Sequence, residues 1–213
     1  LGLTPGDFEA NPNRRYSASA GDVMNWNRSG GSLIWRLVSG ENLNLRTTAY
    51  AHTLDRAWTK FNGFSDGTSA HDLLFTEPDE GLAGSYLNVL RGQEDSTGVD
   101  QRILRGTNDR QFLNTGVASV GHWRWANDSL ENELEFGIRW HKDDVRRYHT
   151  ETAWDMLDGS LTAIEAPEEV LLDSHNDASA WSFHLNNDLG VGPLHVLPGV
   201  RHERITARTG TGD

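Results

Sequence analysis

The residues that could perform catalysis or bind a metal do not form a recognisable catalytic or metal-binding motif. Asp143 and Asp144 of HKDD are neighbours in a strand-like segment, so their side chains point to opposite faces and make a poor general acid/base pair. His202 and Glu203 of RHER point apart for the same reason. The sequence has no HExxH, GxSxG, phosphate-binding loop or GxGxxG. We therefore predict no catalytic residue, no protein-bound metal, no cofactor and no enzyme activity.

Two polar stretches suggest binding instead. Residues 59–110 carry Arg91, Arg102, Arg105 and Arg110, and arginine holds anionic groups through two parallel hydrogen bonds. These arginines could hold an anionic chelate or form ordinary surface ion pairs, and the sequence leaves both interpretations open. Residues 149–176 contain no Lys or Arg but seven carboxylates, which could bind calcium or simply be solvated: Glu151, Asp155, Asp158, Glu165, Glu168, Glu169 and Asp173.

Composition limits the classes of function. The net charge of −12 over 213 residues argues against nucleic-acid binding, which needs a basic surface. The absence of cysteine excludes disulfides and thiolate chemistry. The sequence contains no apolar run of about 18 residues, so it predicts no transmembrane helix. Membrane strands give a much weaker hydropathy signal. Because the sequence starts at Leu1 and ends in the turn-like RTGTGD, we expect it to be part of a longer chain.

The segment ELEFGIRWHKDDVRRY, residues 133–148, shows how the chain is organised. Leu134, Phe136, Ile138 and Trp140 alternate with polar residues, which predicts a strand with one apolar and one polar face. Taken alone, this segment favours a soluble sandwich over a membrane barrel, in which the apolar face would point outward to lipid. The pattern then stops at a charged run, as expected where a strand leaves a hydrocarbon layer roughly 25 Å thick.

Three tight-turn sequences, Ser39–Asn42, Asn127–Leu130 and Leu189–Pro193, each separate two strand-like runs. We therefore predict an all-β, antiparallel up-and-down meander of about six strands, open at both edges. The strands are expected at 28–38, 43–58, 111–126, 131–148, 177–188 and 194–206. The connections 59–110 and 149–176 are long, and alternation of very short with very long connections is typical of outer-membrane barrels rather than of a compact sandwich.

Strand register can be predicted from the turns. A turn at Asp128-Ser129 pairs residues whose numbers sum to 257, which places Arg124 opposite Glu133 and His122 opposite Glu135. A turn at Gly190-Val191 would give a sum of 381 and pair Trp181 with Val200. In the first hairpin, pairing Leu37 with Leu45 sets Arg36 against Arg46, so a bulge or shifted register is expected there.

Aromatic residues are expected near both ends of the strands. Trp123 and Trp125 precede a tight turn, whereas Trp58 and Tyr148 close strands at the long-loop end. This placement is typical of the interfacial girdles of a barrel, although Trp could also cap a soluble core or bind sugar.

Several segments resemble one family. LGLTPGDFEANPNRRYSASAGDVMNW and LNLRTTAYAHTLDRAW resemble a loop and an upward strand of TonB-dependent outer-membrane receptors, and GTNDRQFLNTGV and LPGVRHER resemble later strands. These matches spread over nearly the whole chain in the expected order, and the ferric dicitrate type of siderophore receptor is the most similar. The resemblance implies that residues 1–213 are part of a 22-stranded transmembrane barrel in the outer membrane of a Gram-negative bacterium. The plug domain, the TonB box and the remaining strands would lie outside this sequence.

The resemblance also implies a function. The whole receptor would import a ferric siderophore or ferric citrate with energy from an inner-membrane complex, and its outer face would contact lipid. Position near the outer strand ends and loops suggests these ligand-binding residues: Arg56, Arg102, Arg105, Arg110, Arg147 and His149. The alternatives are a soluble β-sandwich that binds carbohydrate through Trp, and a jelly-roll glycosidase. The barrel predicts one shared, exposed apolar face for Leu134, Phe136, Ile138, Trp140, Trp181, Phe183 and Leu185.

Overall fold

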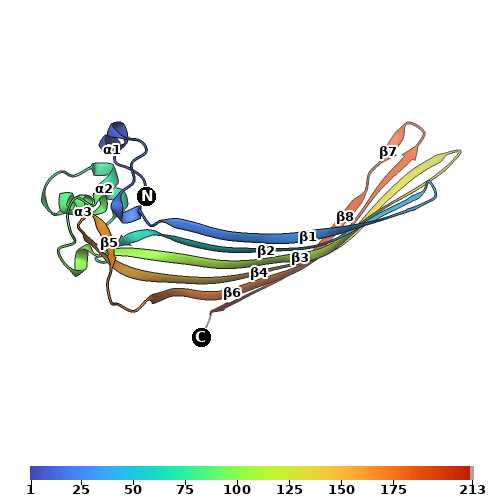
Figure 1. Ribbon diagram of the computed structural model, residues 1–213. Coiled ribbons are helices and arrows are strands. Elements are labelled where there is room, and N and C mark those ends of the chain that lie inside the picture. The colour runs from blue at the N-terminus through green and yellow to red at the C-terminus, as the bar shows by residue number, and fades with distance from the viewer. Residues whose placement is uncertain (212–213) are drawn as a thin grey trace. The chain divides into compact units, whose positions relative to one another are not determined.

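The strands form one antiparallel sheet. A computed structural model describes residues 1–211 (Figure 1). The sheet order is β1-β2-β3-β4-β6-β7, with β5 paired to β4 and β8 paired to β6. The strands are β1 (Val23–Ser39), β2 (Leu43–Phe64), β3 (Ile103–Asn127), β4 (Leu130–Leu157), β5 (Ser160–Ala163), β6 (Glu169–Val191), β7 (Leu194–Val196) and β8 (Gly199–Thr211). The helices are α1 (Pro5–Ala10), α2 (Ala70–Thr76) and α3 (Gly81–Arg91), with short 3-10 turns η1 (Ser17–Ser19) and η2 (Val99–Gln101).

The predicted all-β meander is confirmed. Each long strand pairs with its neighbour in the chain, no helix interrupts residues 111–148, and the sheet is not closed. Within residues 1–211, β1 pairs only with β2 and β8 only with β6, so both edges are open as predicted.

The two long connections are shorter than the sequence predicted. β2 continues to Phe64 and β3 begins at Ile103, so the first connection is residues 65–102 and contains α2, α3 and η2. β4 continues to Leu157 and β6 starts at Glu169, which leaves only the short strand β5 and two brief turns between them. Trp58 and Tyr148 therefore lie inside strands rather than at their ends. The strands extend through polar sequence because ladder hydrogen bonds do not require apolar alternation.

The first two turns fall where the sequence placed them. Asp128 and Ser129 form the turn between β3 and β4, and the Oδ1 atom of Asn127 accepts hydrogen bonds from the backbone N–H of Ser129 and Leu130, both at 3.0 Å. Gly40, at φ 59°, opens the turn between β1 and β2. The predicted shift in this first hairpin is not needed: Ser29 and Thr53 have hydroxyls 2.7 Å apart, in the register that sets Arg36 against Arg46. Solvent at the open edge screens the two cations.

The third hairpin has a different register from the predicted one. Leu185 pairs with Val200 and Trp181 with Arg204, which is a sum of 385 rather than 381, and the turn is at Gly192-Pro193. Gly192 has φ 58°, a left-handed conformation that glycine adopts without strain, and Pro193 has no N–H to donate to a ladder. These two residues make a better turn than Gly190 and Val191. The observed and predicted register sums differ by four, an even number, so each side chain keeps its predicted face.

The chain divides into two compact units. The first, here called the helical unit, comprises residues 1–26, 56–109 and 147–173, and the second, the strand unit, comprises residues 27–55, 110–146 and 174–213. The helical unit holds the main apolar core, in which the ring of Phe64 meets that of Tyr86 edge-on at 4.8 Å. The other buried core residues are Ala18, Phe61, Leu73, Leu87, Val89, Leu90, Ile103 and Met156. None of the described helices is long and apolar enough to cross a membrane.

In the strand unit, β4 and β6 have one largely apolar face and one polar face. Asn132 exchanges side-chain hydrogen bonds with Asn187, and Glu135 contacts His184 at 3.2 Å. Both pairs sum to 319, so even residues of β4 share a face with odd residues of β6. This register puts the seven predicted apolar residues on one face, where Ile138, Trp181 and Phe183 are 52%, 54% and 44% exposed. Among the described residues no second sheet covers them.

Candidate functional site

The six predicted ligand-binding residues differ in their surroundings. Arg56, Arg102, Arg105, Arg147 and His149 belong to the helical unit, whereas Arg110 belongs to the strand unit. Arg147 is exposed, and Arg110 and His149 both have interaction partners. Arg102 donates through Nε to Asp155 Oδ1 at 3.3 Å. Any anionic ligand that binds Arg102 must therefore compete with a carboxylate of the protein itself.

Arg105 has the most unusual environment of the six. Its side chain is only 10% exposed, and its Nη2 atom is 3.8 Å from Asp22 Oδ1. Its guanidinium carbon lies 5.5 Å from the ring centroid of Trp154. Within the described part of the chain, neither Nε nor Nη2 of Arg105 has a hydrogen-bond partner, and the same is true of Nε of Arg56. Buried donors without partners cost free energy, so Arg105 is the predicted residue best able to gain from an added anion or water.

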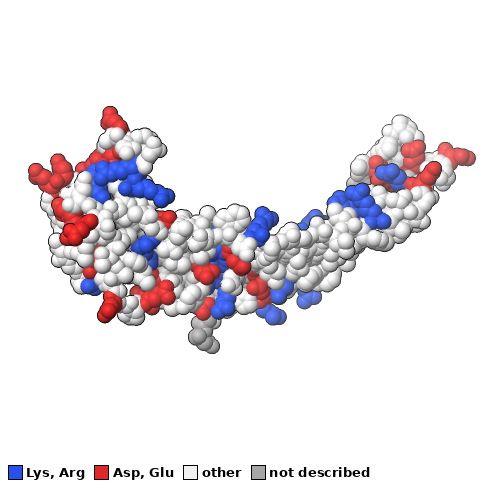
Figure 2. Space-filling model, in the orientation of Figure 1, with Lys and Arg blue, Asp and Glu red and all other residues white. Residues whose placement is uncertain are grey.

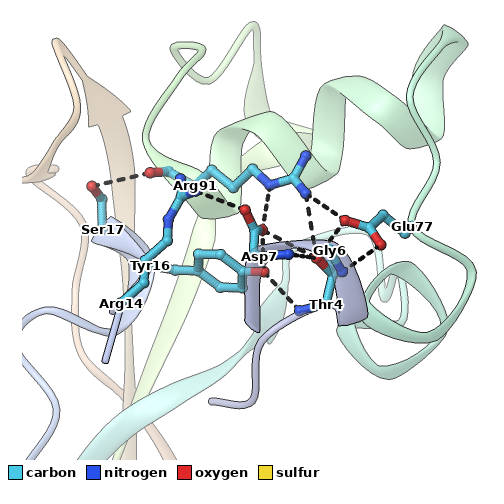
Figure 3. Close-up of polar contacts among 8 residues, drawn as sticks. All are labelled: Thr4, Gly6, Asp7, Arg14, Tyr16, Ser17, Glu77 and Arg91. Carbon is cyan, nitrogen blue, oxygen red and sulfur yellow. Dashed lines mark hydrogen bonds and ion pairs between the residues drawn. The ribbon is translucent and has the colours of Figure 1, made fainter. Parts of the chain in front are cut away.

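A buried polar cluster near the N-terminus was not predicted from the sequence (Figure 3). Asp7 accepts hydrogen bonds from Tyr16 Oη at 2.6 Å, Arg91 Nε at 2.7 Å and Arg14 Nη1 at 2.7 Å. Arg91 also reaches Glu77 Oε1 at 3.1 Å. The cluster joins α1, the residue that ends α2 and the last residue of α3, and it includes partners up to 87 positions apart in sequence.

The cluster shifts the titration of its members. Burial raises the pKa of Asp7, but the hydrogen bonds from Tyr16 and Arg91 and the charges of Arg91 and Arg14 outweigh it, so the pKa lies below its ordinary value. Hydrogen bonds from Thr4 and from the backbone N–H of Gly6 hold the pKa of Glu77 below its usual value. Asp7 and Glu77 are therefore charged at neutral pH, and they hold Arg91 in place. We interpret the cluster as a structural clip for the N-terminal segment.

Two local features allow the clip to form: the helix cap at Thr4 and the close approach of Gly92 to Ser17. Thr4 is the N-cap of α1 and accepts from the backbone N–H of Asp7, while its hydroxyl lies 2.6 Å from Glu77 Oε1. Gly92 ends α3 at φ 76°, and a Cβ there would lie 2.2 Å from Ser17 Oγ. The Thr-Pro start of a six-residue helix was a usable sequence signal, but nothing in the sequence identifies its distant partners.

The polar face of the strand unit carries a network of titratable side chains. Tyr50 Oη lies 2.6 Å from His141 Nδ1, and His141 Nε2 lies 2.8 Å from Asp143 Oδ2. Arg124 donates to Glu133 at 2.9 Å, which confirms that predicted pairing, whereas His122 lies 3.4 Å from Glu133 and 3.8 Å from its predicted partner Glu135. Among residues 1–211 no group of three or more His, Asp or Glu could hold a metal ion. The network pairs the polar groups of these side chains with one another and joins adjacent strands.

The chain is thus an open antiparallel meander, and it matches a fragment of a β-barrel. It is similar to the ferric citrate transporter FecA in the unliganded form, with a TM-score of 0.65 and 14% identity over 99% of this chain and 25% of FecA. It is also similar to BauA, the ferric preacinetobactin receptor from Acinetobacter baumannii, with a TM-score of 0.55 and 10% identity over 92% of this chain and 27% of BauA. No protein-family model and no curated protein sequence matches the chain.

These likenesses concern the fold. At 14% and 10% identity they establish similar backbone architecture and transfer no binding residue. The chain spans about a quarter of the length of either protein. The two similar proteins are a transporter and a receptor, and neither is an enzyme.

Proposed function

We propose that the chain is part of the barrel wall of a TonB-dependent receptor in the outer membrane of a Gram-negative bacterium. The intact receptor imports a ferric chelate, such as a siderophore or ferric citrate, with energy from an inner-membrane complex coupled through a plug domain outside this sequence. The observation that carries the proposal is the open meander of long strands, which aligns over 99% of its length with the ferric citrate transporter FecA.

The apolar face supports a lipid environment. In a soluble sandwich a second sheet would cover Ile138, Trp181 and Phe183, yet the described residues form one sheet and leave these side chains about half exposed. In a barrel wall such side chains contact lipid, while the polar face lines the lumen. This argument favours the receptor over the carbohydrate-binding sandwich.

The helical unit supports a role at a mouth of the barrel. The tight turns join strands within the strand unit, whereas the connection 65–102 and the β4–β6 connection belong to the helical unit. In outer-membrane barrels short turns face the periplasm and long connections lie outside the cell. The helical unit is therefore proposed to be extracellular, where a ferric chelate would first be met.

Arg102 and Arg105 remain the proposed ligand-binding residues of greatest interest, together with Arg56, Arg110, Arg147 and His149. An anionic chelate would replace Asp155 at Arg102 and Asp22 at Arg105 as the partner of each guanidinium. Both exchanges are possible because the Arg102 side chain is 34% exposed and the Arg105–Asp22 contact is long, at 3.8 Å.

Uptake tests the proposal. Cells that depend on the full-length protein for iron should take up radiolabelled ferric citrate or another ferric chelate, and replacing both Arg102 and Arg105 with Ala should lower uptake at least tenfold. Arg46→Ala, which removes an exposed arginine of β2 in the strand unit, is the matched control and should leave uptake unchanged. Lack of uptake of any ferric chelate by cells with the unmodified protein in their outer membrane would refute the function. Unchanged uptake in the double variant would refute only the role of the two arginines.

A further inference from the structure

A hydrogen-bonded cluster on the polar face of the strand unit has no role in the proposed transport function. Its members are Tyr50 on β2, Asn114 on β3, and Arg139, His141 and Asp143 on β4. Each of these three strands pairs with another strand on both of its sides, so no member of the cluster lies at an edge of the sheet. The arrangement of the cluster therefore does not depend on an open strand edge.

The hydrogen bonds of the cluster run in one direction. His141 Nε2 lies 2.8 Å from Asp143 Oδ2, and a carboxylate accepts, so Nε2 is the nitrogen that carries the proton in the neutral ring. Nδ1 is then an acceptor, and Tyr50 Oη lies 2.6 Å from it and donates to it. Asn114 Nδ2 donates to the other oxygen of Asp143, Oδ1, at 2.6 Å. The hydroxyl of Tyr50 thus faces a base that a carboxylate holds in position.

Gly116 makes room for the hydroxyl of Tyr50. It is buried on β3, and a Cβ there would lie 2.5 Å from Tyr50 Oη. Because β3 lies between β2 and β4, the Tyr50 side chain reaches across β3 to meet His141. Elsewhere along the strands, opposite charges lie beside one another, as Figure 2 shows. In this cluster a neutral phenol and an imidazole lie between the cation of Arg139 and the carboxylate of Asp143.

Arg139 completes the surroundings of the phenol oxygen. Its Nη2 atom donates to Tyr50 Oη at 3.0 Å. If Oη gives up its proton, the negative charge that develops there is stabilised by a charged donor more strongly than by a neutral one. A nucleophile within hydrogen-bond reach of a base, with a third group that orients the base, is the arrangement that activates weak nucleophiles. Arg139 is exposed and the Asp143 side chain is 47% exposed, so small molecules in water can approach the cluster.

We propose that Tyr50 is a site of covalent modification that accepts acyl groups from activated carboxylic esters. Tyr50 Oη forms a bond to the ester carbonyl carbon, the bond from that carbon to the alkoxide or phenoxide breaks, and the leaving group departs with the electron pair. The hydroxyl proton moves to His141 Nδ1 and from there to the leaving group or to water. The product is an aryl ester of Tyr50, with one acyl group per chain. The site needs no iron and does not rest on the transport proposal.

The other tyrosines supply an internal comparison. The sequence has four tyrosines, and Tyr16 and Tyr86 are buried and donate to Asp7 and Asp66. Tyr148 is 39% exposed, and within residues 1–211 it makes no hydrogen bond to a histidine or arginine. Acylation of Tyr148 therefore reports the reactivity of a phenol that water can reach and that no neighbouring base assists.

The test treats the full-length protein in detergent with p-nitrophenyl acetate and follows acetylation of each tyrosine by peptide mass spectrometry. Tyr50 should be acetylated at least tenfold faster than Tyr148 in the same sample. Assistance by a positioned base contributes about 100- to 10,000-fold, and the lower exposure of Tyr50 offsets part of it. This comparison needs no substitution, so it does not depend on how a variant folds.

Variants identify the base. His141→Asn keeps an acceptor for the Tyr50 hydroxyl but has no basic nitrogen, so acetylation of Tyr50 should slow to about the rate of Tyr148. His184→Asn is the matched control, because His184 lies on the same face and is paired with Glu135 at 3.2 Å. It should leave the rate at Tyr50 unchanged. Arg139→Gln should lower that rate about fivefold through loss of the charged donor, and all three variants should leave Tyr148 unaffected.

Equal or slower acetylation of Tyr50 compared with Tyr148 in the unmodified protein would overturn the proposal and leave the cluster with a purely structural role. Equal effects of His141→Asn and His184→Asn would also contradict it. Persistence of the acetyl group on the β4 peptide in Tyr50→Phe, in place of the β2 peptide, would show that His141 and not Tyr50 is the acceptor. Because no iron enters these measurements, their outcomes are separate from success or failure of ferric-chelate uptake.

Discussion

Removing the Asp7 carboxylate should release the N-terminal segment from the helices. Asp7→Ala deletes the acceptor of three hydrogen bonds of 2.6 to 2.7 Å, from Tyr16, Arg91 and Arg14. The Asp7 side chain is 9% exposed and that of Arg91 15%, so the change leaves a largely buried cation with Glu77 as its remaining charged partner. Breaking a buried ion pair from one side costs about 3 to 5 kcal/mol, and the retained Glu77 contact places Asp7→Ala near the lower value.

Native-state hydrogen exchange of the α3 amides measures this cost in the full-length protein. A loss of about 3 kcal/mol corresponds to roughly 100-fold faster exchange, since every 1.4 kcal/mol is a factor of ten. Arg14→Ala should have a smaller effect, of about 1 kcal/mol, because the Arg14 side chain is 30% exposed and leaves the Asp7–Arg91 pair intact. Arg147→Ala, at an exposed residue, should change nothing. Equal, small effects of Asp7→Ala and Arg14→Ala would refute the interpretation of the cluster as a clip.

Three further outcomes are expected. The pKa of Asp7 is depressed, so its contribution to the stability of the helical unit is present above its unfolded pKa of about 3.9 and is lost as pH falls through the lower folded value. The protection factors of the α3 amides, which correct for slower intrinsic exchange in acid, should therefore fall only below about pH 4, and less so in Asp7→Asn. Gly92→Ala should destabilise α3 by about 1 kcal/mol or more, because a Cβ at φ 76° is strained and would contact Ser17, whereas Gly63→Ala, which has open space around its Cβ, should be tolerated in the same exchange experiment. The 213-residue chain expressed alone should need detergent or denaturant because its apolar face and strand edges are bare, and a monodisperse, cooperatively unfolding monomer in plain buffer would contradict this.

The sequence predicted the strand unit well because its signals there are local. Alternation along β4 set which residues share a face, and the Asn-Asp-Ser turn set a register that the Arg124–Glu133 contact confirms. The Gly192-Pro193 turn was missed because two glycines, Gly190 and Gly192, offered competing turns, and the preference of Pro193 for the turn decides between them.

The helical unit could be predicted much less completely. Its strands are polar, so their extensions to Phe64 and Leu157 lack alternation. The clip joins Thr4 and Asp7 to Glu77 and Arg91, and such long-range pairing has no signature in a single sequence. For the proposed ligand-binding arginines, the sequence supplied the residue type, but only three-dimensional structure could supply the competing partners Asp22 and Asp155.

The accessibility of spin labels on β4 tests the barrel-wall account most directly. The chain has no cysteine, so single cysteines at Ile138 and Arg139 label adjacent residues on opposite faces. In the full-length protein reconstituted into liposomes, with any other cysteine removed, a nitroxide at residue 138 should collide with oxygen dissolved in lipid and be shielded from a water-soluble nickel chelate. A label at residue 139 should lack this lipid signature. Water exposure of residue 138, or burial of it from both reagents, would contradict a lipid-facing wall.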